Sequence, residues 1–414
     1  MKPKHDIIVI GAGIIGLSTA LKLQASGRAV TVVDRTGVAA EASQGNAGAF
    51  AFSDIEPLAT PGVMRRAPKW LLDPLGPLSI PPAYALKITP WMVRFWRASW
   101  RDRYDHAVAA QAQLMALSQQ ALEQQIIDVK GAHLIRREGQ LQLFEGERAF
   151  RNSLASWDLR AKHGVNFRLL KSAGEIADIQ PGLVARFTHA GFTPDWLNTC
   201  DPKIWTQHIA THFVANGGTI KTANVTKLAQ VDDDIMLHCD AESLRAHQVV
   251  VAAGAWSHRL AHSLGDKIPL ETERGYNTTL PAGTLDLRTH LTFGGHGFVV
   301  SKIGDGVRVG GAVELGGLSL PPNFKRSEVL LKKAKTFLPE LNDLGGTQWM
   351  GFRPSMPDSL PVIGPAPSAR GVFYAFGHGH LGLTQSAGTA ALVASLVNGA
   401  PPPISPAAYS ADRF

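Results

Sequence analysis

The sequence predicts an α/β fold in which a discontinuous Rossmann-like domain is combined with an α+β domain that contains an antiparallel sheet. Four consecutive apolar residues, 7–10, run directly into glycines, as a buried parallel strand does. A second run of this kind, QVVVAAG, lies much later, at residues 248–254. Residues 276–280 and 298–310 resemble antiparallel strands, the latter with a Gly304-Asp305-Gly306 turn. The two kinds of segment alternate along the chain, so we expect one domain to be inserted into the other.

The first strand is followed by a glycine pattern whose spacing predicts dinucleotide binding. Gly11, Gly13 and Gly16 form G-x-G-x-x-G. In that pattern the first glycine permits a tight turn, the second lets the backbone approach a pyrophosphate, and the third lets the helix pack closely on the strand. A helix with apolar residues at helical spacing and a second strand follow, ending at Asp34, a carboxylate placed to bind ribose hydroxyls.

Composition excludes several other classes of protein. The chain has 414 residues, 45% hydrophobic and 18% charged, with a net charge of +7, which suits a globular protein with an anionic ligand. Cys200 and Cys239 have no metal-ligand spacing, and we expect no metal site. No apolar run is long enough to span a membrane, and no signal peptide precedes the first strand. No nucleic-acid module is recognisable.

The order of these segments divides the chain into two expected domains. We expect residues 1–56, 201–265 and 345–414 to form the nucleotide-binding domain, and residues 57–200 and 266–344 the substrate-binding domain. Because ligands of parallel α/β sheets bind at the carboxyl ends of the strands, the loops after Ile10, Ala252 and Ala375 are expected to converge on one ligand.

Three segments lack a clear place in these sheets. Residues 57–90 are rich in proline and predict an irregular surface excursion. Residues 134–144 predict a β-hairpin that turns at Glu138-Gly139. Residues 91–104 alternate tryptophan and phenylalanine with arginine, as an amphipathic helix does. Either this helix packs its aromatic side chains on the core, or it contacts an anionic membrane surface.

Five stretches, in this order, resemble the FAD-dependent D-amino-acid oxidase superfamily, and bacterial D-amino-acid dehydrogenases most of all. They are VIGAGIIG with Asp34, EASQGNAGAF at 41–50, VVVAAGAWS at 249–257, GFRPSMPDSLPVIGP at 351–365 and GHGHLGLT at 377–384. The resemblance implies FAD as the cofactor. It also implies non-covalent binding, because no His lies in residues 35–50 and no Cys follows Cys239.

The resemblance assigns cofactor contacts to the glycine turn, the 43–48 loop, a position near the adenine and the 379–384 loop. The cofactor-binding residues that it implies are Gly11, Gly13, Ile14, Ile15, Gly16, Asp34, Arg35, Ser43, Asn46, Ala47, Gly48, Val225, Ala253, Gly254, Gly379, His380, Leu381, Gly382 and Thr384. Backbone amides of the last loop would face the pyrimidine end of the flavin, where the reduced ring carries negative charge.

Three residues are the candidates for substrate binding and catalysis. Arg353 matches the arginine that clamps the substrate carboxylate in the resemblance, and a guanidinium can donate two parallel hydrogen bonds; alternatively it forms a structural ion pair, for instance with Asp358. Tyr276 resembles a tyrosine near the substrate, and otherwise is a strand aromatic in the core. His380 either bonds to a substrate group or packs.

The resemblance implies oxidation of a D-amino acid, including the D-proline or D-hydroxyproline type, to an imine and then a 2-oxo acid, by hydride transfer to flavin N5. Two alternatives stay open: a glycine- or sarcosine-type secondary-amine oxidase, and the flavin subunit of a multi-component amine dehydrogenase. The expected partners are the amino-acid substrate and a quinone or other electron acceptor. We expect a cytoplasmic protein, with residues 91–104 as a peripheral contact to the inner membrane if the second reading of that helix holds.

Overall fold

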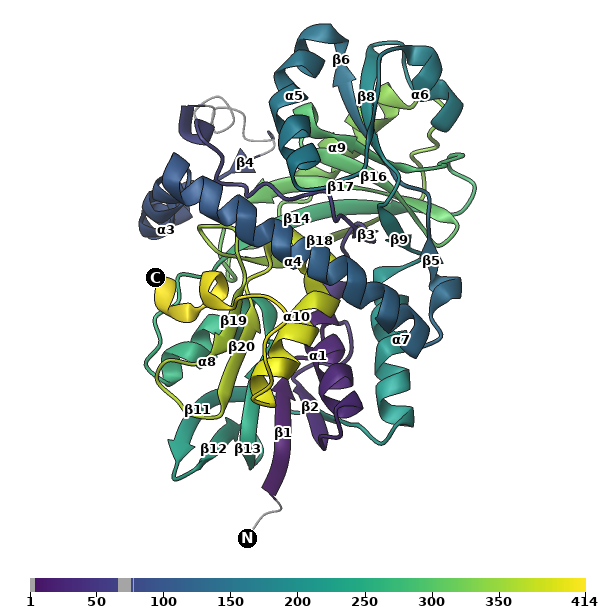
Figure 1. Ribbon diagram of the computed structural model, residues 1–414. Coiled ribbons are helices and arrows are strands. Elements are labelled where there is room, and N and C mark those ends of the chain that lie inside the picture. The colour runs from purple at the N-terminus through teal and green to yellow at the C-terminus, as the bar shows by residue number, and fades with distance from the viewer. Residues whose placement is uncertain (1–3, 66–75, 77) are drawn as a thin grey trace.

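The computed structural model describes residues 4–65, 76 and 78–414 and contains two large sheets at opposite ends of the molecule (Figure 1). One is mainly parallel and the other mainly antiparallel, which confirms the expected fold class. The helices within these residues are α1 (Ile14–Ala25), α3 (Ala85–Ala98), α4 (Arg101–Asp128), α5 (Gly146–Lys162), α6 (Ala173–Ile179), α7 (Pro202–Ala215), α8 (Ser257–Ser263), α9 (Lys325–Phe337) and α10 (Gly382–Val397).

The first sheet is built around the two apolar runs of the sequence. Its parallel strands are, in spatial order, β10 (Thr219–Thr222), β2 (Val30–Asp34), β1 (Lys4–Ile10), β13 (Ser243–Val251) and β20 (Val372–Phe376). Residues 7–10 of β1 lie between 30–33 of β2 and 248–251 of β13, so both runs are buried side by side. Antiparallel strands β11 (Val225–Val231), β12 (Asp234–Cys239) and β19 (Val362–Pro365) complete the sheet.

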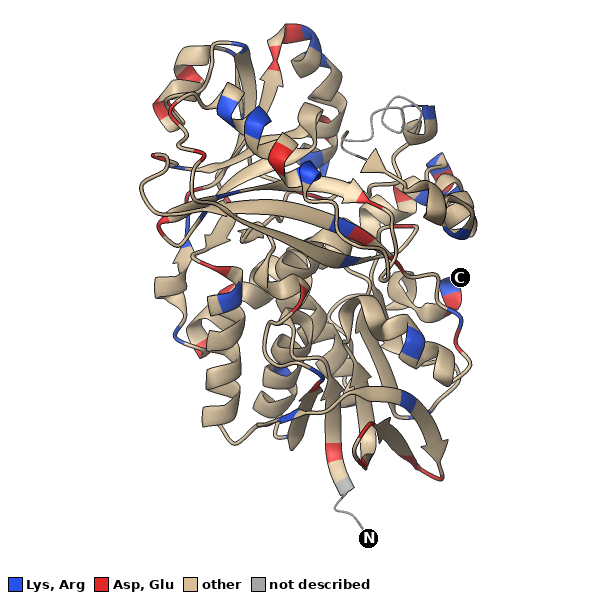
Figure 2. Cartoon of the chain, turned by 180° about the vertical axis from the view of Figure 1, so that it is seen from behind, with Lys and Arg blue, Asp and Glu red and all other residues tan. Residues whose placement is uncertain are grey.

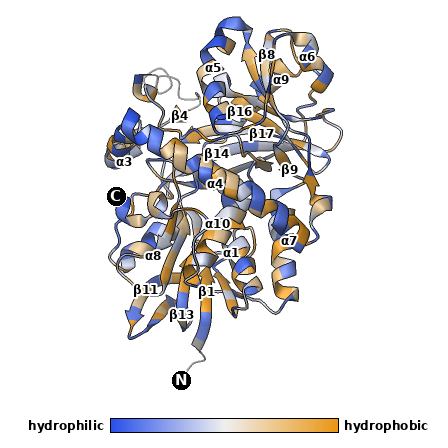
Figure 3. Cartoon of the chain, in the orientation of Figure 1, coloured by the Kyte–Doolittle hydropathy of each residue, from blue (hydrophilic) through white to orange (hydrophobic). Residues whose placement is uncertain are grey.

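Helices cover one face of this sheet and bury its apolar side chains. Helix α1 packs against α10, and α10 packs against the long helix α4. Figure 3 shows apolar residues concentrated on β1, α1 and α10, where these elements face one another. The hairpin β11–β12 and helix α8 pack on the other side. The carboxyl ends of the parallel strands point toward the second sheet, and α4 crosses the molecule between the two sheets in the view of Figure 1.

The second sheet has the spatial order β18-β14-β17-β16-β15-β6-β8-β7. Its strands are β6 (Gln140–Glu145), β7 (Arg168–Leu170), β8 (Phe187–Thr193), β14 (Glu271–Leu280), β15 (His290–Phe293), β16 (Phe298–Ile303), β17 (Gly306–Glu314) and β18 (Thr347–Ser355), with β4 (Leu78–Ser79) on β17. Strands β16 and β17 join through the predicted turn at residues 304–306. Leucine and phenylalanine side chains of this sheet form a separate core under α9.

Two local predictions differ from the structure because longer-range pairing decides them. Residues 134–144 do not form a hairpin: β5 (Ile135–Arg136) pairs with β9 (Leu197–Thr199), whereas β6 pairs with β8 and β15. Strand β9 also pairs with β3 (Ala49–Phe50), which makes a small third sheet. Strand β18 begins at residue 347 and is an edge of the antiparallel sheet, although residues 345–414 were expected in the nucleotide-binding domain.

The aromatic and basic segment 91–104 is two helices rather than one. Helix α3 ends at Ala98, and Trp100 is extended before α4 begins at Arg101. The Ser99 hydroxyl donates to the Trp96 carbonyl oxygen at 2.7 Å, a local bond that competes with helix continuation. Part of the proline-rich excursion, residues 66–75 and 77, lies outside the described residues. None of the described helices has both the length and the apolar composition of a membrane span.

Candidate functional site

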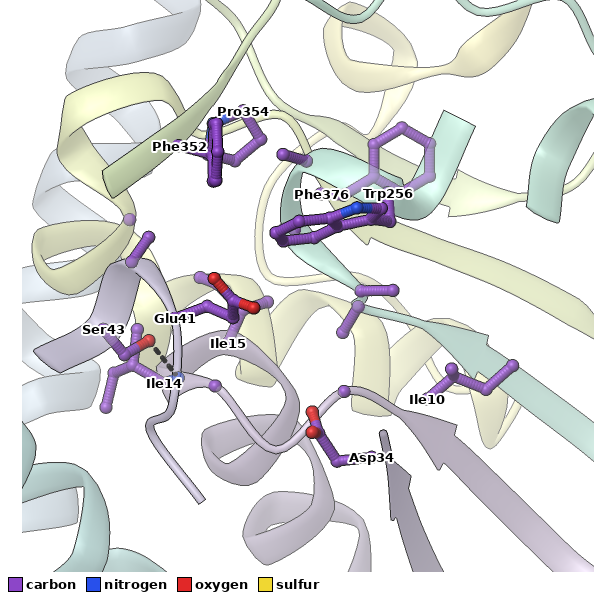
Figure 4. Close-up of a pocket in the computed structure, with 18 of the residues that line it drawn as sticks. Ile10, Ile14, Ile15, Asp34, Glu41, Ser43, Trp256, Phe352, Pro354 and Phe376 are labelled. Carbon is purple, nitrogen blue, oxygen red and sulfur yellow. Dashed lines mark hydrogen bonds between the residues drawn. The ribbon is translucent and has the colours of Figure 1, made fainter. Parts of the chain in front are cut away.

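A cavity of about 410 Å³ lies at the carboxyl ends of β1, β2, β13 and β20, where sequence analysis places the ligand. It is lined at one end by residues around Asp34 and Val225 and at the other by Phe352, Arg353 and His380. Figure 4 shows Asp34 and the glycine turn on one wall, with Trp256, Phe352, Pro354 and Phe376 on the facing wall. The loops after the three predicted strands therefore meet at one cavity.

The glycine turn has no room for side chains. Gly11 has a φ of +115°, and a Cβ there would lie 2.3 Å from the Ala252 carbonyl oxygen. A Cβ on Gly16 would lie 1.9 Å from the Gly11 carbonyl oxygen, which is how closely α1 approaches the turn. Gly13 precedes α1, and the backbone N–H of Ile14 donates to the Ser43 hydroxyl at 3.0 Å (Figure 4). The start of α1 lines the cavity through Gly13, Ile14 and Ile15, and a helix start in this position is an arrangement that binds phosphate.

Asp34 is held in place by backbone amides. Its Oδ2 accepts a hydrogen bond from Ala12 N at 2.8 Å, and its Oδ1 accepts from Thr36 N at 2.8 Å and Gly37 N at 2.9 Å. These bonds fix the carboxylate at the edge of the cavity, where it can accept further bonds from hydroxyl groups. Its position fits the ribose-binding role that the motif predicts.

Next to Asp34, the predicted residue Arg35 is held by two residues that sequence reasoning missed. Arg35 donates to Glu41 at 2.5 Å, and its guanidinium carbon lies 3.7 Å from the centroid of the Trp256 ring. Glu41 and Trp256 both line the cavity but were not predicted to do so. An arginine held flat between a carboxylate and an indole makes a planar wall, against which an aromatic ring can stack.

The 43–48 loop is fixed to the antiparallel sheet. Asn277 Nδ2 donates to the Gly45 carbonyl oxygen at 2.7 Å, and Arg308 Nη1 donates to that of Asn46 at 2.6 Å. Ser43 and Asn46 line the cavity as predicted, whereas Ala47 and Gly48 are not among its lining residues. The Asn46 side chain accepts from Gly48 N at 2.7 Å, so Gly48 shapes the loop.

The loop after β20 closes the other end of the cavity. Gly379, His380 and Gly382 line it, and α10 begins at Gly382. Leu381 and Thr384 do not line it, although Thr384 Oγ1 accepts from Ala51 N at 2.9 Å and so ties α10 to the 43–51 segment. The amides at the start of α10 point toward this end, where they can stabilise negative charge.

The two histidines of this loop are neutral near pH 7. Burial lowers the pKa of His378 to about 3, and its Nε2 lies 2.9 Å from the Thr389 hydroxyl. His380 is exposed to the cavity, yet the protein that surrounds it and the nearby Arg353 charge lower its pKa to about 4. A neutral imidazole can donate one hydrogen bond and accept another. His380 therefore offers hydrogen bonds to the cavity without adding charge.

The structure brings Arg353 to the cavity and fixes its guanidinium between Gly275 and the Ala312 carbonyl oxygen. Nη1 donates to the Ala312 carbonyl oxygen at 3.1 Å, and the group lies over Gly275, where a Cβ would come within 2.2 Å of Nη2. The structural alternative for Arg353, an ion pair with Asp358, does not form: Asp358 instead accepts from Arg413 at 2.7 Å. Burial lowers the pKa of Arg353, while Glu273 raises it. The guanidinium stays charged and can bind a carboxylate in the cavity.

Tyr276 is the predicted substrate residue that the structure does not bring to the cavity. Its hydroxyl donates to Glu314 at 3.0 Å and accepts from Asn323 N at 3.0 Å. The side chain is buried in the antiparallel sheet and is not among the residues that line the cavity. These bonds occupy the hydroxyl and match the alternative considered for it, a strand aromatic in the core. Val225, Ala253, Gly254, Ile14 and Ile15 do line the cavity, as predicted.

The residues present fit an elongated dinucleotide. The glycine turn and the start of α1 line the middle of the cavity, and the turn is too close to the Ala252 backbone for a side chain at Gly11. A carboxylate lies at one end, and a second helix start and a guanidinium lie at the other. No group of three histidine, cysteine or acidic side chains suited to a metal occurs in the part of the chain that the structure describes.

Comparison with known proteins agrees with this geometry. Residues 6–396 match the family described as FAD dependent oxidoreductase. The chain is 35% identical to a D-amino-acid oxidase from Bradyrhizobium diazoefficiens, with all of both chains covered. It is 32% identical to a D-amino acid dehydrogenase from Rhizobium johnstonii, over 96% of this chain and 97% of that one. A glycine oxidase structure from Geobacillus kaustophilus superposes with a TM-score of 0.79 at 19% identity, covering 99% of each chain, which shows a shared fold.

Proposed function

The chain belongs to the FAD-dependent oxidoreductase family that includes D-amino-acid oxidases and dehydrogenases, and we propose that it oxidises a D-amino acid using non-covalently bound FAD. Bound FAD would supply the acceptor for the Cα hydrogen as hydride; the protonated imine left behind would be hydrolysed by water to a 2-oxo acid and ammonium. The protein binds the substrate, orients its Cα–H bond and holds its carboxylate. The observation that carries the proposal is the half-buried guanidinium of Arg353, anchored to the Ala312 carbonyl oxygen at one end of a dinucleotide cavity.

In this proposal each part of the cavity has a separate task. The amides at the start of α1 hold the pyrophosphate, and Asp34 binds the ribose hydroxyls. The amides at the start of α10 lie at the flavin end. Arg353 takes the substrate carboxylate through two parallel hydrogen bonds. Neutral His380 adds a hydrogen bond to the substrate without a second positive charge.

Anaerobic titration of the flavin tests this function. We expect the purified protein to be yellow, with an absorbance band near about 450 nm, and D-amino acids to bleach it, since hydride transfer reduces the flavin. The panel should contain D- and L-alanine, D- and L-proline, glycine and sarcosine. Bleaching by glycine or sarcosine alone would favour the secondary-amine oxidase alternative. Bleaching by L-amino acids alone would contradict the proposal, as would a flavin that none of these compounds reduces without a partner protein.

A second proposal concerns the surface formed by α3 and the start of α4. Trp91 packs in the core and stacks on Phe95, but Leu86 is 91%, Val93 56%, Trp96 49% and Trp100 48% exposed. Basic residues lie on the same helices, as Figure 2 shows at the side of the molecule that carries α3, where blue segments stand beside red ones. Exposed aromatic and aliphatic side chains among basic ones suit an anionic membrane surface, from which a quinone could take the electrons.

Vesicle binding tests this contact. Helix α3 carries Lys87 and Arg94, whereas the charges of Arg97 and Arg101 are offset by Asp102 and Asp105. We expect binding to anionic vesicles at low salt, and the double variant Lys87→Gln, Arg94→Gln to lose about 1 kcal/mol per charge. The double variant Arg148→Gln, Lys162→Gln, which removes two exposed charges from α5, is the matched control. Equal sedimentation with neutral and anionic vesicles would contradict the proposal.

A further inference from the structure

Glu273 is a buried carboxylate beside the candidate substrate arginine. It lies on β14 directly opposite Arg353 on β18, so the two side chains share one face of the sheet. Glu273 is 4% exposed. Its Oε2 is buried and makes no hydrogen bond of good geometry within the described residues, although the Ser355 hydroxyl lies near enough to lower the pKa of the acid. A buried acid with an unbonded oxygen is costly unless a charge or a proton compensates it.

The groups around Glu273 leave Arg353 as its compensating charge. Glu273 lines a second, small cavity of about 10 Å³ together with Glu56, Ser355, His378 and His380. Both histidines are neutral near pH 7, for the reasons given above. Glu56 lies 3.4 Å from Arg160, which offsets its charge.

The strand on the other side of β14 adds no compensating charge. Glu314 of β17 pairs with Arg274 at 3.1 Å, and Arg274 points to the opposite face of β14 because successive strand residues alternate. Arg353 is the charged group whose field acts on Glu273.

When a substrate binds, Arg353 would therefore interact with two carboxylates, that of Glu273 and that of the substrate. Two carboxylates around one half-buried cation cannot both stay ionised at little cost, and the one that gains less from the cation takes a proton. The Arg353 guanidinium leans over Gly275, away from its neighbour Glu273, so its open donors are directed to the cavity rather than to the acid. The substrate carboxylate can then form the shorter, direct hydrogen bonds.

We propose that Glu273 is the internal counter-ion of Arg353 and takes up one proton from solvent when a carboxylate binds the arginine. The proposal rests on the function proposed above and adds a charge-balancing role for a residue that touches neither FAD nor substrate. Glu273 is in this sense a positioning residue. The new bond is the O–H of the glutamic acid, and the net charge of the buried group is unchanged by binding.

The protonation behaviour of both groups supports this role. Burial raises the pKa of Glu273 above its ordinary value, although Arg353 pulls it down. When a bound carboxylate neutralises Arg353, that pull weakens and the pKa of Glu273 rises further. Binding is then tightest below the pKa of Glu273 in the free enzyme. Above it, the dissociation constant rises about tenfold per pH unit, until the pH passes the pKa in the complex.

Acetate binding to the oxidised holoenzyme, followed by the flavin absorbance from about pH 5 to about pH 9, tests the proposal. Wild type is expected to bind acetate more weakly as the pH rises and, by calorimetry in two buffers, to take up about one proton per acetate within that window. Glu273→Gln is expected to bind acetate without proton uptake and with a dissociation constant that is constant across that window. Glu271→Gln, two residues earlier on the same strand, is the matched control and should keep the wild-type slope.

Each result of this test separates the two proposals. A wild-type protein that takes up no proton anywhere in this range overturns the inference, even if Glu273→Gln does not fold. An unchanged slope in Glu273→Gln overturns it as well. Undiminished acetate binding by Arg353→Ala would instead overturn the carboxylate clamp of the proposed function.

Discussion

Replacing Arg353 with alanine is expected to lower kcat/KM for a D-amino acid by roughly 30- to 1,000-fold, about 2 to 4 kcal/mol of lost transition-state binding. The substrate carboxylate loses its cation, and Glu273 is left as an uncompensated buried acid. Flavin content should stay at the wild-type level, because the pyrophosphate and ribose contacts lie at other parts of the cavity. Steady-state kinetics with a redox dye measures kcat/KM, and the flavin spectrum of each preparation measures the flavin content.

Two further variants separate the charge of Arg353 from its placement. Arg353→Lys keeps the charge but not the planar fork, so we expect it to recover only part of the activity. Gly275→Ala keeps the arginine but puts a methyl group where the guanidinium lies, 2.2 Å from Nη2. The end of a flexible side chain can move aside, so this variant should fold, retain FAD and bind substrate more weakly. Wild-type kinetics in Arg353→Ala would exclude the clamp.

The cofactor half of the site was predictable from sequence because local geometry determines it. The spacing of Gly11, Gly13 and Gly16 indicates a tight turn and a close contact between helix and turn. Both features lie within one short stretch of chain. Asp34 follows at the end of the next strand and bonds back to Ala12 N, again within the same unit. Only the burial of this unit against β13 depends on distant residues.

The substrate half was predictable in part, because its residues depend on strand register. A strand residue points to one face or the other, and the sequence alone does not say which face meets the cavity. Tyr276 bonds to Glu314, a residue 38 positions later on β17, and this partner is defined only by the pairing of β14 with β17. Glu273 is a neighbour of Arg353 because of the register between β14 and β18, which the sequence does not show.

Aromatic residues of the cavity wall were missed for a different reason. Trp256 and Phe352 line the cavity, and Trp256 stacks with Arg35. In a sequence, such residues are indistinguishable from core aromatics, because both occupy apolar surroundings. The available signal was their place in two stretches that carry the family resemblance, 249–257 and 351–365. Residues 134–144 illustrate the same limit, since their two strands have partners that lie far along the chain.

Gly16→Ala is expected to abolish FAD binding and to destabilise the protein by about 3 kcal/mol or more, because the added Cβ would lie 1.9 Å from the Gly11 carbonyl oxygen. Backbone cannot move aside as a side chain can, so α1 must shift away from β1 and its amides leave the pyrophosphate position. Gly27→Ala is the control: it lies just beyond the other end of α1, at a φ of +85° with open space around it. That variant should lose about 1 kcal/mol and keep FAD. The ratio of flavin to protein absorbance, with the Tm, distinguishes the two, and a Gly16→Ala protein with full flavin content would contradict the close helix contact.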